Sequence, residues 1–271
     1  MFNAKIGYHG STWGRDGLLK AVEEISEIGY RGFETLGEFY NIYDNYKGRI
    51  NDFKEILAKH GLQLASFYCE GVKERGKIQE GIKRMVDIAN FLKENGSDII
   101  IMACGHGYPY ENFKEMVETV EEVAKRCSDI GMKVCCHPHL DTMVETREEI
   151  SMLMDSTKHI YMCADTAHLL AGGSDPVEVI STYIDRVKYL HFKDFNPEKE
   201  KDLARYSESN GMLAIFSELG NGKVNFPRIL DVLKEGNYDG WLMVELDSST
   251  RPPKESAMIS KQYLEELGIK I

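Results

Sequence analysis

Short apolar runs alternate with longer amphipathic segments along the whole chain, and this alternation predicts the fold. The runs are rich in β-branched residues, as expected for strands that are buried on both faces. They cover residues 4–10, 32–36, 63–69, 98–105, 133–139, 160–166, 187–195 and 241–246. Eight strands that alternate with helices favour an α/β fold, a closed (β/α)8 TIM barrel, over an open doubly wound sheet. No glycine-rich dinucleotide-binding motif follows the first run, which also counts against the open sheet.

The segments between these runs have the periodicity of amphipathic helices. The clearest of them are residues 18–29, 50–61, 78–96 and 113–131. In the last segment, Met116, Val120 and Val123 recur at three- and four-residue spacing, which places them on one helix face. Each segment ends in glycine, which readily adopts the left-handed conformation that closes a helix. We expect these helices to cover the outside of the barrel.

Composition narrows the class of protein. No linker or shift in composition divides the 271 residues, so we expect a single domain, residues 1–271. The six cysteines, without a signal-peptide pattern, are typical of reduced thiols and predict a cytoplasmic location. No apolar stretch is long enough to span a membrane. The net charge of −11 argues against nucleic acid as a partner, because that requires a basic surface.

Histidines and acids gather at one predicted rim of the barrel. Chemistry in such barrels lies at the C-terminal ends of the strands. Six of the eight histidines fall at or just after a strand end, namely His9, His106, His137, His139, His168 and His191. Asp165 and Glu245 end the sixth and eighth strands, and Glu34 ends the second. A carboxylate there is costly unless it is paired or bound to a metal ion.

Four of these residues end four consecutive strands and are expected to converge. They are His137, Asp165, His191 and Glu245. Imidazole and carboxylate ligands without a thiolate suit Mn²⁺, Co²⁺, Fe²⁺ or Zn²⁺, and less well Mg²⁺. An ion-pair network without a metal is the alternative interpretation. His139 is expected to face the mouth beside His137, because the two are two residues apart on one strand.

Two loops have weaker signals. Trp13 after the first strand and the group Phe39, Tyr40 and Tyr43 after the second either line a ring-shaped ligand or simply pack. Residues 218–226, ELGNGKVNF, form a glycine-containing loop where barrels often bind phosphate. Lys223 is its only basic residue, so a plain tight turn is the favoured interpretation.

Several longer motifs resemble one known superfamily. They are HGSTWGRDGLLKAVEEISEIGYRGFET, HPHLDTMVET, CADTAHLLAGGSDP, RVKYLHFKDF and ELGNGKVNFPRILDVLKEGNYDGWLMVELD. Together they resemble the xylose-isomerase-like TIM-barrel superfamily of sugar isomerases, epimerases and dehydratases. Within it, the chain is most similar to the inosose (2-keto-myo-inositol) dehydratases. The resemblance covers nearly the whole chain and is most specific in the second half.

The resemblance implies roles for individual residues. Asp165, His191 and Glu245 match the metal ligands of the superfamily, whereas His137 stands where sugar epimerases have a glutamate. His168 matches a residue that contacts substrate, and His139 matches the base of related dehydratases. The arginine that epimerases carry shortly after the seventh-strand histidine is missing, and Lys193 is the expected substitute. Glu34, Trp13 and His106 complete the expected substrate contacts, with Mn²⁺ as the expected metal.

A dehydratase is the favoured function. An epimerase of this kind needs a carboxylate on each face of the planar intermediate, and the histidine at position 137 removes one of them. A dehydratase needs one base for the α-proton and one acid for the leaving hydroxyl. His139 or Glu245 is the candidate base and His168 the candidate acid, since histidine titrates near neutral pH. The expected substrate is a small keto-sugar or keto-cyclitol.

Other functions are weighed against this one. A metal-dependent sugar isomerase or ketose 3-epimerase would use the same three ligands, Asp165, His191 and Glu245. A lyase that eliminates from 3-keto-glycosides, some with a small partner subunit, and a non-catalytic scaffold are further alternatives. An apurinic endonuclease is disfavoured by the acidic charge. A homo-oligomer and a complex with a small partner subunit both stay open.

Overall fold

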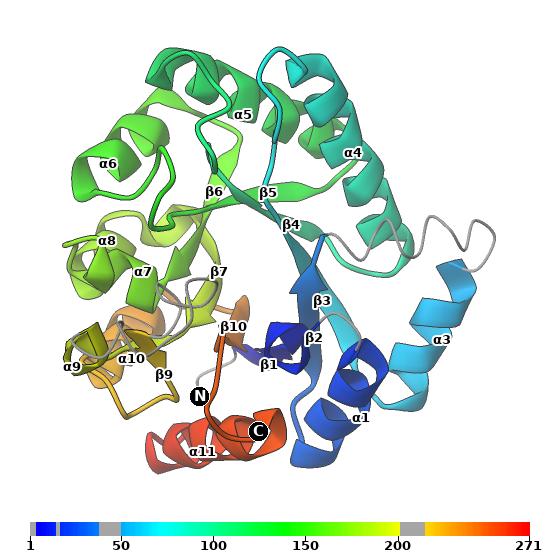
Figure 1. The fold of residues 1–271 in the computed structure, drawn as a ribbon, viewed down its shortest axis with the longest axis vertical. Helices are drawn as coiled ribbons and strands as arrows, with labels where there is room; N and C mark the ends of the chain where they lie inside the picture. Colours follow the sequence, from blue (N-terminus) through cyan, green and yellow to red (C-terminus); the bar gives the residue numbers. More distant parts are fainter. Residues whose placement is uncertain (1–3, 15–16, 38–49, 201–214) are drawn as a thin grey trace.

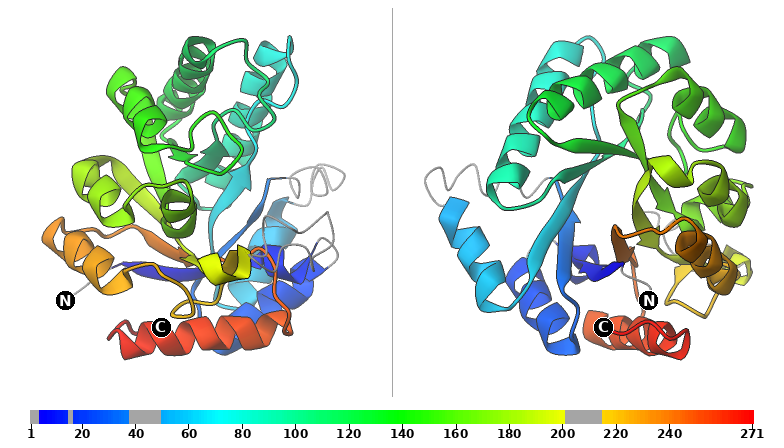
Figure 2. Two further views of the ribbon diagram at one scale, coloured as in Figure 1. Left: turned by 60° about the vertical axis from the view of Figure 1, so that its left-hand side comes forward. Right: turned by 180° about the vertical axis from the view of Figure 1, so that it is seen from behind.

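The fold is a closed barrel of eight parallel strands inside a ring of helices, as predicted (Figure 1). It is seen in a computed structural model that describes residues 4–14, 17–37, 50–200 and 215–271. Neighbouring strands around the barrel follow the order β1-β10-β7-β6-β5-β4-β3-β2. Views from both ends show the helices outside the strands on every side (Figure 2).

The strands of the barrel match the predicted apolar runs closely. They are β1 Lys5–His9, β2 Gly32–Leu36, β3 Gln63–Cys69, β4 Ile99–Ala103, β5 Lys133–His137, β6 Ile160–Asp165, β7 Val187–Phe192 and β10 Trp241–Val244. A separate two-stranded antiparallel sheet pairs β8 Asp194–Phe195 with β9 Phe216–Ser217.

The helices follow the predicted amphipathic segments. The α-helices are α1 Leu18–Ile28, α3 Ile50–Lys59, α4 Ile78–Glu94, α5 Phe113–Asp129, α6 Arg147–Ser156, α7 Thr166–Ala171, α8 Pro176–Thr182, α9 Pro197–Glu200, α10 Phe226–Glu235 and α11 Pro253–Glu266. Short 3-10 helices occupy Gly10–Trp13 and Ile184–Arg186. The ring closes where α11 packs beside α1 (Figure 1).

Local sequence signals explain where several helices begin. Asn112 caps α5 by accepting the backbone N–H of Glu115. Thr146 and Glu149 form a reciprocal capping box at the start of α6. Asp175 caps α8, whose first residue is a proline.

The barrel has a core on each side of its strands. The outer core lies between strands and helices and includes Met116, Val120 and Val123 from the buried face of α5. The inner core fills the barrel with side chains such as Ile101, Cys135, Cys163, Tyr189 and Met243. The barrel is therefore packed along its axis, and its chemistry is confined to the rim.

Glycine allows the strands to approach closely where the barrel closes. Gly7 of β1 pairs with Gly32 of β2. A Cβ atom at Gly7 would lie 2.6 Å from Met243, and one at Gly32 would lie 2.3 Å from the ring of Trp241. These two positions leave room for the large inner side chains of β10.

Two predicted strand ends are wrong in an informative way. The fifth strand ends at His137 and not at His139, because Pro138 has no N–H to continue the ladder. The seventh strand ends at Phe192, and Asp194 and Phe195 pair instead with β9. His139 therefore reaches the rim from a turn, and strand alternation does not explain its position.

Two expectations depend on which residues the structure describes. Phe39, Tyr40 and Tyr43 lie in 38–49, outside the described residues. Within the described residues, no helix has both the length and the apolar character required to cross a membrane.

Candidate active site

The four predicted ligands come together at the rim of the barrel. One ligand atom from each of His137, Asp165, His191 and Glu245 lies within 4.8 Å of the others, and all four residues are buried. His137 Nε2 is 3.3 Å from Asp165 Oδ2, and His191 Nδ1 is 2.7 Å from Glu245 Oε2. Atoms bound about 2.1 Å from one ion are about 3.0–3.5 Å apart, so this cluster has the dimensions of a metal site.

The turn after β6 orients Asp165. Its Oδ1 atom accepts the backbone N–H groups of Ala167 and His168, at 2.9 and 2.7 Å, and so caps α7. The other oxygen, Oδ2, is left to face His137 and His191. The sequence Asp-Thr-Ala-His thus positions a ligand by starting a helix directly after a strand.

Glu34 orients His191 from the opposite wall of the barrel. Nε2 of His191 donates to the Glu34 carboxylate at 3.0 Å, and the hydroxyl of Tyr189 donates to the same carboxylate at 2.8 Å. Both Glu34 and His191 are fully buried. With Nε2 occupied, His191 presents Nδ1 to the cluster, as a carboxylate partner commonly does for a metal-binding histidine.

Two buried polar atoms that lack a hydrogen bond indicate that the cluster is built for a cation. Among the described residues, His191 Nδ1 and Glu245 Oε2 form an ion pair at 2.7 Å, but neither atom makes a hydrogen bond. Buried polar atoms rarely lack partners. Asp165, Glu245 and Asp247 face the ammonium of Lys193, and the fourth carboxylate, Glu34, faces His191. This excess of negative charge and the donor set fit a divalent metal ion.

The electrostatics of the cluster agree with that assignment. Burial alone would raise the pKa of the Glu245 carboxyl, but His191 and Lys193 hold that pKa well below its usual range. Burial would lower the pKa of His191, but Cys163, Glu245 and Glu34 raise it well above its usual value. The site therefore favours carboxylates in their charged form and a positive charge next to them.

Lys193 lies inside the site, as expected from its place two residues after His191. Its side chain is 1% exposed. Nζ lies 2.8 Å from Asp247 Oδ2, 3.3 Å from Glu245 Oε2 and 3.4 Å from Nε2 of His168. Burial opposes a charged lysine, but Asp247 and Glu245 outweigh it and raise the pKa of the ammonium above its usual value.

His139 and His168 form a second pair of imidazoles beside the cluster. Their ring centroids are 3.8 Å apart, and that of His137 is 5.6 Å from His139. The backbone of Leu140 sets the tautomers of the pair. Nδ1–H of His139 donates to the carbonyl of Leu140 at 2.6 Å, and the N–H of Leu140 donates to Nδ1 of His168 at 3.3 Å. In the neutral rings, Nε2 of His139 is therefore unprotonated and Nε2 of His168 carries a proton.

Burial keeps both of these imidazoles neutral. Burial, with His137 and Lys193, lowers the pKa of His139 to about 3. Burial, with His139 and Lys193, lowers the pKa of His168 well below its usual value. His106 adjoins the pair, with its ring centroid 6.1 Å from that of His139.

Two residues expected to contact substrate have other contacts. Both carboxylate oxygens of Glu34 already accept hydrogen bonds from Tyr189 and His191, and its contact with substrate stays a prediction. Trp13 donates its indole N–H to Glu24 at 2.6 Å and packs edge-on against Tyr8. Its polar group is thereby used to fix the loop after β1 against α1.

The loop at 218–226 is a turn, as favoured, and its amides already have an anionic partner. The carboxylate of Asp194 accepts backbone N–H groups from Gly220, Gly222 and Val224, at 2.9–3.0 Å. A Cβ atom at Gly222 would lie 2.2 Å from this carboxylate. The amides that would bind a phosphate are thus occupied from within the chain.

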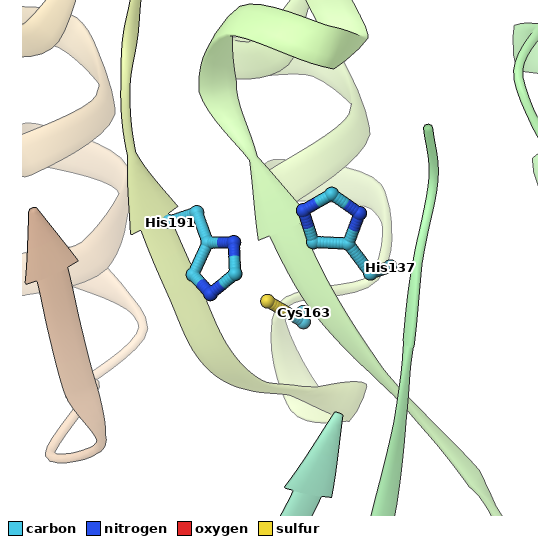
Figure 3. A group of neighbouring side chains, drawn as sticks. All are labelled: His137, Cys163 and His191. Carbon is cyan, nitrogen blue, oxygen red and sulfur yellow. The ribbon is translucent and has the colours of Figure 1, made fainter. Parts of the chain in front are cut away.

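Cys163 is a residue of the site that the sequence analysis missed. A second potential metal-binding group consists of His137, Cys163 and His191, whose ligand atoms also lie within 4.8 Å of one another. Figure 3 shows the sulfur between the two imidazole rings. Strand alternation was the available signal, because Cys163 is two residues before Asp165 on β6 and so faces the same side.

Comparisons with known proteins agree with the fold. A family model of the xylose isomerase-like TIM barrel matches residues 22–267. An inosose dehydratase of Clostridium botulinum (strain Alaska E43 / Type E3) is 30% identical, with 98% of this chain and 99% of that protein covered. A solved structure of the probable 3-DHS dehydratase AsbF from Bacillus anthracis has a TM-score of 0.78 at 16% identity, with 96% of this chain and 98% of that one covered. The IOLI protein, solved with a zinc atom, has a TM-score of 0.76 at 16% identity, with 97% of both chains covered.

Proposed function

The chain belongs to the xylose isomerase-like TIM barrel family, and from this premise we propose that it is a metal-dependent lyase that dehydrates a keto-cyclitol or keto-sugar. The reaction removes the proton next to a carbonyl and expels the hydroxyl of the following carbon as water. One observation carries the proposal: the metal-type cluster lies directly beside His139, a half-buried imidazole whose Nε2 is unprotonated in the neutral ring. Similarity to an inosose dehydratase along the full chain supports this class of substrate.

The cluster would bind the metal ion through His137, Asp165, His191 and Glu245. When bound, a divalent ion supplies Lewis-acid chemistry that polarises a carbonyl and stabilises the enolate formed from it. With imidazole and carboxylate ligands alone we propose Mn²⁺, with Co²⁺, Zn²⁺, Fe²⁺ and Mg²⁺ as alternatives. Glu34 holds His191 in the ligating orientation throughout.

His139 is the proposed base. Its low pKa, about 3, keeps Nε2 unprotonated at neutral pH. The negative charge of Asp165 favours the imidazolium that forms when Nε2 takes the α-proton. Glu245, which was the other candidate base, is already engaged with His191 and Lys193.

His168 is the proposed acid. Its Nε2 proton is available to the hydroxyl that leaves as water, because Nδ1 accepts the N–H of Leu140. The ammonium of Lys193 lies 3.4 Å from the same Nε2. Because an ammonium has no acceptor, it does not hydrogen-bond to the protonated Nε2, and it is placed to return a proton only after His168 has donated its own. The base and the acid are thus distinct groups, as elimination requires, and they are not the symmetric carboxylate pair of an epimerase.

The test is an assay in D₂O with ultraviolet and proton-NMR detection. The purified protein is incubated with each of the five metals and with 2-keto-myo-inositol or a panel of ketohexoses. A new conjugated enone absorbance with 2-keto-myo-inositol is the expected result. Deuterium in a ketose of inverted configuration, without new absorbance, would replace the lyase by an epimerase. Release of the aglycone from a 3-keto-glycoside would identify the other lyase alternative.

A further inference from the structure

Cys163 lies where a deeper donor to the same metal ion would lie. It is fully buried on β6, and its side chain faces the barrel axis one inward position below Asp165. Its sulfur is between the imidazoles of His137 and His191 (Figure 3). The three ligand atoms lie within 4.8 Å of one another. Both imidazoles also belong to the four-residue cluster, so the two groups share their histidines.

Packing explains a small buried side chain at this position but not its surroundings. Cys135, on the neighbouring strand β5, belongs to the same inner core and is equally buried, yet it belongs to neither potential metal-binding group among the described residues. Cys163 instead hydrogen-bonds with His191, an imidazole that both groups share. A buried thiol that lies between two imidazoles is the arrangement expected around a cation.

The spacing of the three-residue group is compatible with one ion shared by the two imidazoles and the thiol. Zinc lies about 2.3 Å from a thiolate sulfur and about 2.1 Å from an imidazole nitrogen, so the two donor atoms are about 3.5 Å apart in a tetrahedral site, inside the 4.8 Å within which the three ligand atoms lie. A bound metal ion deprotonates a coordinating thiol outright, and the proton passes to solvent.

We propose that Cys163 is a further ligand of the metal site and that its thiolate makes the site selective for a thiophilic ion. The ion would be held by the imidazoles of His137 and His191 and by the sulfur of Cys163. Such a set prefers Zn²⁺, Co²⁺ or Fe²⁺ over Mn²⁺ and Mg²⁺, because sulfur is a soft ligand. This inference rests on the metal site of the proposed function and replaces Mn²⁺ as its preferred ion.

Cobalt absorption tests the inference without any assay of activity. The full-length protein is freed of metal with a chelator and titrated with Co²⁺ in the absence of oxygen. Thiolate ligation produces a sulfur-to-cobalt charge-transfer band in the near ultraviolet in addition to the visible d–d bands. We expect this band in the wild type and its loss in both Cys163→Ser and Cys163→Ala, with the d–d bands retained. Circular dichroism shows that each variant is folded.

Two other cysteines provide control variants for the replacement of Cys163. Cys135→Ser removes the equally buried thiol of the same layer, and Cys136→Ser removes a thiol that lies 2.8 Å from the sulfur of Cys104. Both controls should keep the band. Cys163→Ser should also lower the affinity ratio of Zn²⁺ to Mn²⁺ by at least about tenfold, or about 1.4 kcal/mol. Metal uptake by the wild type should release one proton more than uptake by Cys163→Ser.

The outcomes separate this inference from the function on which it rests. Visible d–d bands without a charge-transfer band in the wild type would overturn thiolate ligation and leave the four-residue metal site intact. A band that persists in Cys163→Ser would overturn it as well. No cobalt spectrum at all would overturn both the inference and the metal site.

Discussion

Two histidines of one short motif take different environments because a proline separates them. His137 is the last residue of β5 and points its ring at Asp165 and His191. Pro138 ends the strand, and the following turn stacks His139 against His168. The backbone of Leu140 then fixes which nitrogen of each ring is free. One imidazole is thereby placed to bind a cation and the other to accept a proton.

Replacing His139 tests whether this residue acts as the base and not as a metal ligand. His139→Gln should lower kcat about 10²- to 10⁴-fold, because it removes the base, while metal affinity stays unchanged. Dehydration rate and Co²⁺ titration measure the two effects separately. His60→Gln is the control, since His60 directly follows α3 and its hydrogen bonds within the described residues are made by its backbone. Equal losses of kcat and metal affinity in His139→Gln would place His139 among the ligands.

Replacing Glu34 tests how His191 is oriented. Glu34→Gln keeps an acceptor for Nε2 but removes the negative charge, so metal affinity should fall about 10- to 100-fold. Isothermal titration with Zn²⁺ measures it. Glu34→Ala should lower the metal affinity further. It should also destabilise the fold, because it leaves His191 Nε2 and the Tyr189 hydroxyl unpaired in the core. An unchanged affinity in both variants would contradict the orienting role.

At this scale the sequence predicts the identities of the rim residues better than their contacts. Alternation along β6 places Asp165 inward, and the same rule, applied two residues earlier, finds Cys163. It does not reveal that Glu34 reaches across the barrel to His191, because that contact joins residues 157 positions apart. The tautomer of His139 likewise depends on one carbonyl in a turn whose shape no periodicity specifies.

At the scale of elements, helix caps and strand ends are fixed by local chemistry, and connections depend on partners from elsewhere. The predicted helices and strands agree with the structure except where proline or a competing partner intervenes. Asp194 is a residue with such a competing partner. Its carboxylate accepts three backbone N–H groups of the loop after β9, and the chain leaves β7 at this point. The sequence contains this acid and these glycines but does not show that they meet.

Glu121 shows how one element secures another at the opposite end of the barrel. From α5, its carboxylate accepts the backbone N–H groups of Lys158 and His159, at 3.0 and 3.2 Å, and pairs with the His159 ring at 2.7 Å. These residues lead into β6. Burial opposes the shift, but the hydrogen bonds from His159 and Lys158 lower the pKa of the Glu121 carboxyl below 4.5.

The effect of Glu121 on stability should depend on pH. Because its folded pKa is lowered, its contribution is present above about pH 4.5, the unfolded value, and disappears as pH falls through the folded pKa. Glu121→Gln should lower the free energy of unfolding by about 1 kcal/mol at neutral pH and by less in acid. Urea denaturation at several pH values measures this. Glu122→Gln, whose exposed pair with Arg126 contributes little, should change stability by less than about 0.5 kcal/mol.

At the scale of the whole molecule, the barrel is predictable because every buried strand must alternate with a covering helix. The site is predictable to the extent that parallel strands end at one rim. The sequence does not predict how far each side chain lies from the rim. Glu34 lies beneath the cluster, and Lys193 lies within it. Those positions follow from the diameter and stagger of the closed barrel, which arise only when all eight strands pack together.

The metal site should also stabilise the whole barrel. Its proposed ligands belong to β5, β6 and β7 and to the residue directly after β10, so one ion would link four neighbouring strands. Without the ion, the acids around His191 are only partly compensated by Lys193. Saturating metal at 100 times its dissociation constant should therefore add about 2.7 kcal/mol to the free energy of unfolding.

Thermal melting with and without a chelator measures this linkage. Asp165→Asn should lose the metal-dependent rise in melting temperature, because it removes the ligand that faces both His137 and His191. The chelated form of Asp165→Asn should melt below the chelated wild type. Burial opposes the shift, but Lys193 and His137 hold the pKa of the Asp165 carboxyl below its usual value, so its charged form stabilises the folded state. Asp231→Asn, on the exposed face of α10, should retain the full rise. A melting temperature that does not respond to metal in the wild type would mean that the cluster is held by its own ion pairs, and that Lys193 alone balances the acids around it.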